Sequence, residues 1–249
     1  LILPDAYTLS TLLSICINTS SLLLGKQTHA YVLRHGQFKE TLIGNALINM
    51  YSQGGTLEKS LEVFNQMSQK DVVSWNSLIS AYARHGEGER AVMTYKTMQD
   101  EGKVDPDAAT FAAVLSACSH AGLVEEGLEI FNSMVEPNVD HFSCLVDLLG
   151  RAGRLDEAES LVKMSEKSIG SGVDVWWGLF SACAAHGDLK LGKMVAKLLM
   201  EREKNDPSVF VQLSNIYAGA GLWKEAEETR EAMKMIGAMK QRGCSWMRL

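Results

Sequence analysis

The sequence predicts an all-α fold, a right-handed solenoid of about seven helix–turn–helix repeats. The first reason is a glycine that recurs with steps of 31, 36, 31, 34 and 34 residues. The second is an apolar segment with helical spacing in front of each of these glycines. The third is the low number of prolines, four in 249 residues, which leaves room for many helices. The glycine series is Gly55, Gly86, Gly122, Gly153, Gly187 and Gly221.

Two neighbouring segments show the repeat most directly. Residues 45–55 match residues 76–86 at a shift of 31 positions. The matching pairs are Asn45/Asn76, Leu47/Leu78, Ile48/Ile79, Tyr51/Tyr82 and Gly55/Gly86. A match of this kind indicates one structural unit that occurs several times and buries its apolar face only against the next unit.

Each unit is expected to contain a first helix, a turn at the recurring glycine and a second, amphipathic helix such as 56–67 or 154–164. Glycine favours the turn because it adopts the left-handed conformation after a helix at no steric cost. The expected units are 6–40, 41–71, 72–107, 108–138, 139–172, 173–206 and 207 to about 240.

Composition limits the classes of function. Apolar residues make up 46% of the chain, and no apolar run approaches the roughly 20 residues of a membrane-spanning helix. The net charge is −6, and all of it comes from residues 1–138, with 9 basic and 15 acidic groups. This argues against binding of nucleic acid mainly through its phosphates. Residues 1–5 do not resemble a signal or transit peptide, so we expect them to lie inside a larger chain.

The cysteines do not form a metal-site or disulfide pattern. Cys16, Cys118 and Cys183 fall four residues before a turn, in a column that tyrosine or leucine fills in other units, and are expected to pack between helices. Cys144 and Cys244 lie elsewhere, and no C-x-x-C motif occurs. We therefore expect no disulfide, no metal and no cofactor.

Several stretches carry a more specific signal. Residues 71–86 read DVVSWNSLISAYARHG, and 107–134 and 139–162 form a long and a short unit after them. The tail contains VWWGLFSACAAHGDLKLG at 175–192, and VFVQLSNIYAGAGLWKEAEETREAMK at 209–234 precedes GCSWMRL at the end. In type and order these resemble the repeats of the plant organellar pentatricopeptide-repeat (PPR) family, PLS class, followed by the E1 and E2 motifs of its E subgroup.

The resemblance covers essentially the whole chain and implies a domain plan. Residues 1–172 would be PLS-type PPR repeats, 173–206 the E1 motif, and 207–249 the E2 motif and the start of the following segment. Two stretches depart from the family's pattern. The unit 108–138 is shorter than usual before Pro137, and SEKSIGSG at 165–172 replaces a proline-containing link that ends at Gly172, the last position of the unit 139–172.

By the resemblance, the fifth and the last residue of each repeat would read one RNA base. The pairs Asn45/Asp71 and Asn76/Asp107 match the family's combination for uracil. The weaker positions are Ser10, Glu40, Ala112, Asn138 and Ser143. Asparagine offers a donor and an acceptor together, and a carboxylate can fix the amide's orientation through a bound water. The second positions Leu42 and Val73 would clamp the base from the side.

The resemblance also implies a target and partners. Two uridines would face 41–107, at about −7 and −6 from an edited cytidine in organellar single-stranded RNA. The E1 and E2 motifs would recruit a separate DYW-type deaminase or small editing factors, with Trp223 and Trp246 as candidate contacts. The family resemblance suggests a mitochondrial protein, with the chloroplast as the alternative.

Other interpretations stay open at the sequence level. Asparagine near a helix start and aspartate at a turn are often only caps. The acidic charge also suits a protein-interaction scaffold of the tetratricopeptide type. Catalysis is not expected, because a cytidine deaminase needs H-x-E and P-C-x-x-C motifs. The only H-x-E, at 85–87, falls on a turn, and P-C-x-x-C does not occur.

Overall fold

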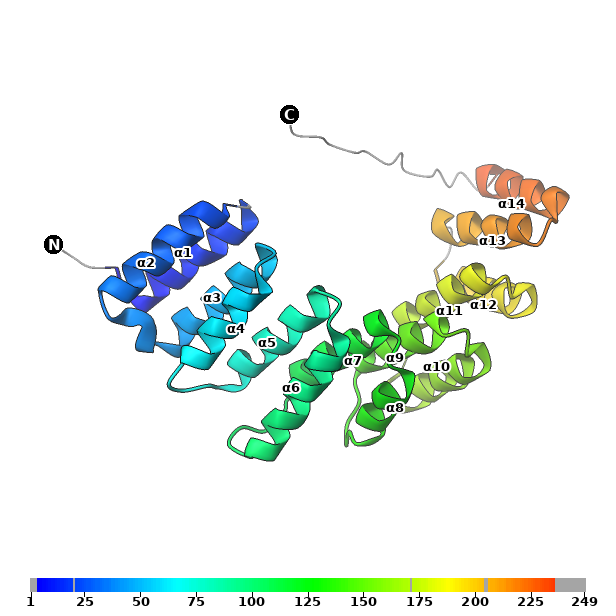
Figure 1. Ribbon diagram of the computed structural model, residues 1–249. Helices are drawn as coiled ribbons and strands as arrows, with labels where there is room; N and C mark the ends of the chain where they lie inside the picture. Colours follow the sequence, from blue (N-terminus) through cyan, green and yellow to red (C-terminus); the bar gives the residue numbers. More distant parts are fainter. Residues whose placement is uncertain (1–3, 20, 171, 204–205, 236–249) are drawn as a thin grey trace. The chain divides into compact units, whose positions relative to one another are not determined.

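The computed structural model describes residues 4–19, 21–170, 172–203 and 206–235. Over these ranges the chain forms fourteen α-helices and one short 3-10 helix, and no strand (Figure 1). The predicted all-α fold is therefore confirmed, and the chain is a helical-repeat solenoid. None of the helices in these ranges is long and apolar enough to cross a membrane.

The helices come in pairs, and every expected unit contains one pair. The first helices are α1 (Ala6–Asn18), α3 (Thr41–Gln53), α5 (Val72–Arg84), α7 (Ala108–Ala121), α9 (Val139–Arg151), α11 (Val173–His186) and α13 (Pro207–Gly219). The second helices are α2 (Leu22–Arg34), α4 (Leu57–Gln66), α6 (Gly88–Glu101), α8 (Val124–Asn132), α10 (Leu155–Ile169), α12 (Leu189–Arg202) and α14 (Trp223–Met235). The 3-10 helix η1 (Gln37–Lys39) follows α2.

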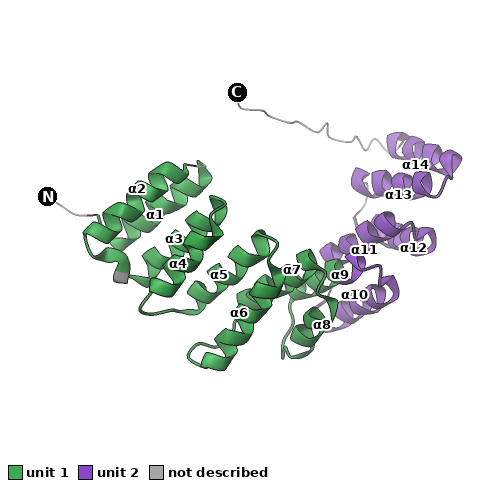
Figure 2. Ribbon diagram, in the orientation of Figure 1, with its two compact units in different colours: residues 1–148 green, residues 149–249 purple. Residues whose placement is uncertain are grey.

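The chain divides into two compact units, residues 1–148 and 149–249 (Figure 2). In the first unit, α3 packs against α1 and α5, and α5 packs against α7. In the second unit, α11 packs against α10, α12 and α13, and α13 packs against α14. Within each unit the first helices of successive repeats therefore lie next to one another, as a stacked array requires.

The recurring glycine performs the predicted role at the turn between the two helices. Gly122 and Gly187 cap the C-termini of α7 and α11 in the left-handed conformation, each with φ of 71°. Their backbone N–H groups bond to the carbonyls of Cys118 and Cys183, four residues earlier. A side chain at this φ would be strained, which explains why the sequence keeps glycine here.

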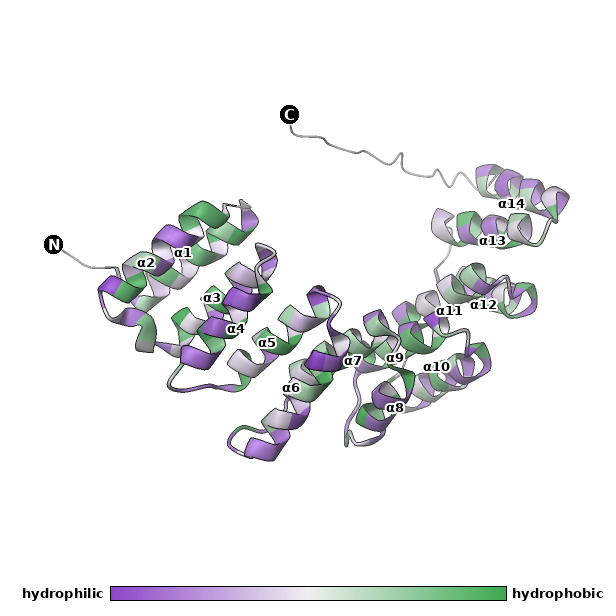
Figure 3. Cartoon of the chain, in the orientation of Figure 1, coloured by the Kyte–Doolittle hydropathy of each residue, from purple (hydrophilic) through white to green (hydrophobic). Residues whose placement is uncertain are grey.

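The column four residues before the glycine lies in the core except at its last member, the half-buried Tyr217. Tyr51, Tyr82 and Leu149 are buried, and so are the cysteines Cys16, Cys118 and Cys183, which are free thiols. Burial raises the pKa of Cys118 and Cys183 to about 12, so neither thiol ionises near neutral pH. Cys244 lies outside the described residues. Helices such as α10 and α14 show both hydrophobic and hydrophilic residues in Figure 3, as amphipathic helices in a stack should.

Candidate nucleic-acid interface

The predicted base-reading residues occupy equivalent places on successive first helices. Asn45 is the fifth residue of α3, and Asn76 is the fifth residue of α5. The last residues of the same repeats, Asp71 and Asp107, are the N-caps of α5 and α7. Because first helices of neighbouring repeats pack together, an asparagine on one helix lies beside the cap of the next helix.

Each asparagine contacts its aspartate directly. The amide Nδ2 of Asn45 donates a hydrogen bond to Oδ1 of Asp71 at 3.1 Å. The amide Nδ2 of Asn76 donates to Oδ1 of Asp107 at 3.0 Å. Both pairs predicted from the sequence therefore meet in the structure, and the contact is a direct bond where the sequence suggested a bridging water. A carboxylate accepts hydrogen bonds only, so it fixes which end of each amide faces it.

The aspartates cap helices, whereas the asparagines do not. Oδ1 of Asp71 accepts from the Ser74 backbone N–H at 2.8 Å, and Oδ1 of Asp107 accepts from the Thr110 N–H at 2.8 Å. Both form full capping boxes. Asn45 lies inside α3, whose N-cap is Glu40. The asparagine amides thus have no part in capping, which leaves their polar atoms for another role.

Both carboxylates are held in the charged form. Burial raises the pKa of Asp71, but hydrogen bonds from the Ser74 amide and from Asn45 outweigh it, and the pKa falls below its usual 3.8. Asp107 behaves in the same way, with Thr110 and Asn76 as the donors. At neutral pH each carboxylate is therefore charged and can hold the amide nitrogen of its asparagine.

The weaker predicted positions do not form such pairs. Ser10 Oγ donates to the Tyr7 carbonyl on its own helix at 3.0 Å, and Glu40 caps α3 without a side-chain bond. Ala112 has no polar side-chain atom. Asn138 is engaged with His141, because its Oδ1 accepts from the His141 backbone N–H at 3.2 Å. Ser143 is half-buried on α9. Gly172, the last position of the unit 139–172, is the N-cap of α11.

The second positions present apolar surface to solvent. Leu42 and Val73 are 45% and 50% exposed, although both sit next to buried residues on their helices. Tyr7 holds the same position on α1 and is 76% exposed. The sequence interpretation missed Tyr7, although its place two residues after the cap Asp5 is the same as that of Val73 after Asp71. Exposed apolar and aromatic side chains of this kind are suited to contact a flat base.

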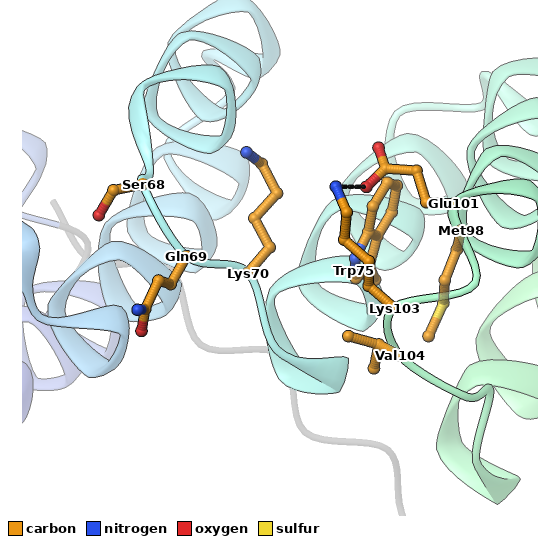
Figure 4. Close-up of a pocket in the computed structure, with 8 residues that line it drawn as sticks. All are labelled: Ser68, Gln69, Lys70, Trp75, Met98, Glu101, Lys103 and Val104. Carbon is orange, nitrogen blue, oxygen red and sulfur yellow. Dashed lines mark hydrogen bonds and ion pairs between the residues drawn. The ribbon is translucent and has the colours of Figure 1, made fainter.

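A pocket lies between the loops that precede the two aspartates (Figure 4). Its volume is about 480 Å³, and its lining includes Lys70, Lys103 and Trp75. Lys70 Nζ donates to the Met67 carbonyl at 3.0 Å, and Lys103 pairs with Glu101 at 3.2 Å. Both lysines already have protein partners and are less available to a phosphate. The pocket is therefore a weaker candidate for an RNA contact than the asparagine pairs.

The remaining sequence candidates have simpler outcomes. Trp223 is 72% exposed at the start of α14, whereas Trp246 lies outside the described residues. At the H-x-E sequence, His85 Nε2 bonds to the Ser52 carbonyl at 2.9 Å and Glu87 pairs with Arg90 at 2.5 Å. Within the described ranges no group of three His, Cys, Asp or Glu side chains could hold a metal ion.

Comparison with known families gives one consistent result. The E motif model matches residues 186–248, and a PPR repeat family model matches 70–120. Further PPR repeat models match residues 133–164, 45–72 and 109–139.

Curated plant proteins match along the whole chain. A pentatricopeptide repeat-containing protein of Arabidopsis thaliana is 87% identical over 253 residues, which cover 100% of this chain and 34% of the relative. Another from the same plant, labelled chloroplastic, is 42% identical over 249 residues and covers 98% of this chain and 28% of its own length. The chain thus spans about a third of the length of these relatives.

Solved structures agree on the fold. The crystal structure of the pentatricopeptide repeat protein PPR10 from maize superposes with a TM-score of 0.69 at 18% identity, over 94% of this chain and 40% of that chain. A crystal structure of PPR10 in complex with an 18-nt psaJ RNA element superposes with a TM-score of 0.59 at 20% identity, over 95% of this chain and 34% of that chain. At these identities the likeness shows a shared fold.

Proposed function

We propose, since the chain belongs to the pentatricopeptide-repeat family and carries its E motif, that it reads single-stranded RNA through successive repeats. It is a helical-repeat scaffold of this family rather than a catalytic domain. One base per repeat is a general property of such repeats. The observation that supports the proposal is the pair of amide–carboxylate hydrogen bonds, Asn45–Asp71 and Asn76–Asp107, at equivalent places in neighbouring repeats.

The chemistry of these pairs suits uracil. Each amide gives one N–H to its aspartate and keeps a second N–H for a base carbonyl, while Oδ1 can accept the N3–H of uracil. Adjacent uridines are therefore the expected target of residues 41–107. PPR10, which shares the fold, has been solved in complex with an 18-nt psaJ RNA element, and this supports an RNA ligand for the chain. The exposed side chains Leu42 and Val73, with Tyr7 in the preceding repeat, are proposed to hold the bases from the side.

We further propose a role in specifying sites of organellar C-to-U RNA editing. The E motif match over residues 186–248 supports this, because it overlaps the E1 and E2 motifs proposed at 173–206 and 207–249. These motifs would recruit a separate DYW-type deaminase or small editing factors, with exposed Trp223 as a contact. The two uridines would then lie at about −7 and −6 from the edited cytidine.

The proposed compartment is the mitochondrion, with the chloroplast as the alternative. Several relatives are labelled chloroplastic, which supports an organelle in either case. A fluorescent fusion of the full-length protein in plant cells tests the choice. Signal that overlaps a chloroplast marker alone would replace the mitochondrial proposal, and a cytosolic signal would end both.

A protein-interaction scaffold is the second candidate. The net charge of −6 favours it, since an acidic surface repels phosphates. A tetratricopeptide repeat protein from Parabacteroides merdae also shares the fold, with a TM-score of 0.58 at 13% identity, over 93% of each chain. The paired amides and carboxylates oppose a scaffold role for residues 41–107, because a protein-binding surface has no need of this repeated arrangement.

Equilibrium binding to short single-stranded RNAs decides between the two candidates. One RNA places UU opposite residues 41–107, and matched RNAs place AA, GG or CC there. The UU RNA should bind best, and Asn76→Ser should shift the preference at its nucleotide towards a purine. Equal binding of all four RNAs, or binding of none at low salt, would reject base reading by this chain and favour the scaffold.

A further inference from the structure

The two asparagine pairs differ at the carbonyl end of the amide. Oδ1 of Asn45 is buried and has no hydrogen-bond partner among the described residues, and the residue as a whole is 6% exposed. Oδ1 of Asn76 instead accepts a hydrogen bond from Thr110 Oγ1 at 2.6 Å. The first amide is therefore held at one end only, and the second is held at both ends.

Thr110 comes from the following repeat, where it is the third residue of α7 and is fully buried. Its hydroxyl accepts from the Asp107 backbone N–H at 3.0 Å. The single hydroxyl proton has two acceptors within reach, Asn76 Oδ1 at 2.6 Å and Asp107 Oδ1 at 2.9 Å. The shorter of the two hydrogen bonds runs from the Thr110 hydroxyl to the amide oxygen, so the threonine links the base-reading amide to the cap of the next helix.

Ser74 is the counterpart of Thr110 in the preceding pair. It is the third residue of α5, it completes the capping box of Asp71, and its hydroxyl donates to Asp71 Oδ1 at 2.9 Å. The described structure shows no bond between Ser74 and Asn45, in keeping with the unpartnered oxygen of that amide. Ser74 therefore only completes a helix cap, whereas Thr110 completes a helix cap and also contacts the base-reading amide.

The orientation of the amide matters because it separates uracil from cytosine. Uracil presents an N3–H donor beside the O4 acceptor, whereas cytosine presents an N3 acceptor beside an N4 amino donor. A carboxamide that matches uracil in one orientation matches cytosine after a flip, because the flip exchanges its donor and its acceptor. Any group that holds the amide in one orientation therefore increases the discrimination between the two pyrimidines.

We propose that Thr110 is a specificity-determining positioning residue for the repeat 72–107. It holds the oxygen of the Asn76 amide while Asp107 holds the nitrogen, so this repeat selects uracil over cytosine more sharply than the repeat 41–71 does. The inference rests on the proposed function, which assigns the base contacts to the two asparagines. A flip of the Asn76 amide would place its oxygen against the Asp107 carboxylate and would also lose the hydrogen bond from Thr110. A flip of the Asn45 amide would only place its oxygen against a carboxylate.

The burial of Asn45 also supports weaker uracil selection by the repeat 41–71. Its free oxygen is covered by protein atoms, so a base can reach it only after a neighbouring side chain moves. Asn76 is half-exposed, and its oxygen already has a partner in Thr110. A pre-organised amide loses less conformational freedom when the base binds, which strengthens binding to the matching base.

The test measures the uracil-to-cytosine affinity ratio separately at the nucleotides facing 41–71 and 72–107. In the unsubstituted chain the ratio should be larger at the second nucleotide. Thr110→Val keeps the shape and removes the hydroxyl, so the second ratio should fall about fivefold, as expected for one neutral hydrogen bond. The first ratio should not change, and Thr110→Ser, which restores a hydroxyl, should recover the second ratio.

Ser74→Ala is the matched control, because it removes the capping-box hydroxyl in the other repeat without touching the reading amide. It should leave both ratios unchanged, although it weakens the cap. A purely structural role of Thr110 predicts instead that Thr110→Val and Ser74→Ala act alike. A ratio unaltered by Thr110→Val, in a chain where Asn76→Ser still shifts the base preference, would overturn the inference and leave the proposed function standing. No preference at either nucleotide in the unsubstituted chain would reject both.

A second readout needs no RNA. The side-chain NH₂ resonances of Asn45 and Asn76 can be followed by NMR in the free chain. Thr110→Val should increase the mobility of the Asn76 carboxamide towards that of Asn45, and Thr110→Ser should not. An Asn76 carboxamide that is as mobile as Asn45 before any substitution would contradict the proposed lock.

Discussion

At the residue scale, one carboxylate oxygen serves two purposes in each reading pair. Oδ1 of Asp107 accepts from the Thr110 backbone N–H, which caps α7, and also from the Asn76 amide. Capping and base reading are therefore not alternatives for the aspartates. An aspartate substitution would change helix stability and base preference together, so the asparagine is the better position to substitute. Thr110 shares the capping box of Asp107, which is why its substitution needs Ser74→Ala as a control.

A different residue contact makes stability depend on pH. His29 bonds through Nδ1 to the Tyr51 hydroxyl at 2.8 Å, and its buried Nε2 has no partner among the described residues. Burial, with a smaller effect of Lys59, lowers the pKa of His29 below 6.5 in the folded state. Above pH 6.5 the ring is neutral in both states, and below it the unfolded chain binds a proton that the folded chain does not. Stability should therefore fall as the pH drops below about 6.5.

Thermal unfolding at a series of pH values between about 7.5 and about 5 measures this effect. His29→Gln should flatten the decline relative to the unsubstituted chain. The exposed His120 provides the control, and His120→Gln should leave the decline unchanged. If both substitutions gave the same pH profile as the original chain, burial of His29 would not be the cause.

At the element scale, the sequence predicted helix starts better than helix contacts. The starts of α3, α5 and α7 coincide with the expected unit starts at 41, 72 and 108, because the glycine period and the cap residues are local signals. The bond between Asn76 and Thr110 joins residues 34 positions apart and depends on how α5 and α7 pack, which no local pattern encodes. The motif D-x-x-S/T at 71–74 and 107–110 could have revealed Thr110, but only as a capping residue.

The turn after each first helix gives an element-scale prediction. Gly122 has φ of 71°, and a Cβ added there would meet no atom within 4 Å. The cost of Gly122→Ala is therefore backbone strain alone, about 1 to 2 kcal/mol of unfolding free energy. Denaturant unfolding followed by circular dichroism measures it.

Gly219 is the matched control for this substitution. A Cβ added at Gly219 would also meet no atom within 4 Å, but this glycine ends α13 without a positive φ. Gly219→Ala should be neutral or stabilising by up to about 1 kcal/mol, since alanine favours helix. Equal destabilisation by both alanines would mean that the left-handed turn is not the source of the cost.

At the scale of the whole molecule, the charge is distributed unevenly between the two compact units. Residues 1–148 contain 9 basic and 17 acidic groups, a net charge of −8, and residues 149–249 contain 15 and 13, a net charge of +2. The asparagine pairs belong to the acidic unit. Phosphate attraction is weak there, so base contacts must supply much of any affinity, and a modest affinity with clear base preference is the expected combination.

Salt dependence of RNA binding tests this balance. The affinity for the UU-containing RNA should fall with a shallow slope in a double-logarithmic plot against salt, equivalent to about two or three phosphate contacts at roughly 0.7 per contact for a single strand. The preference for UU over CC should stay constant across the same salt range, because hydrogen bonds to base edges release few counterions. A steep slope with a preference that disappears at low salt would instead assign the binding to the phosphates and to the basic residues of 149–249, and the reading pairs would then contribute little to the complex.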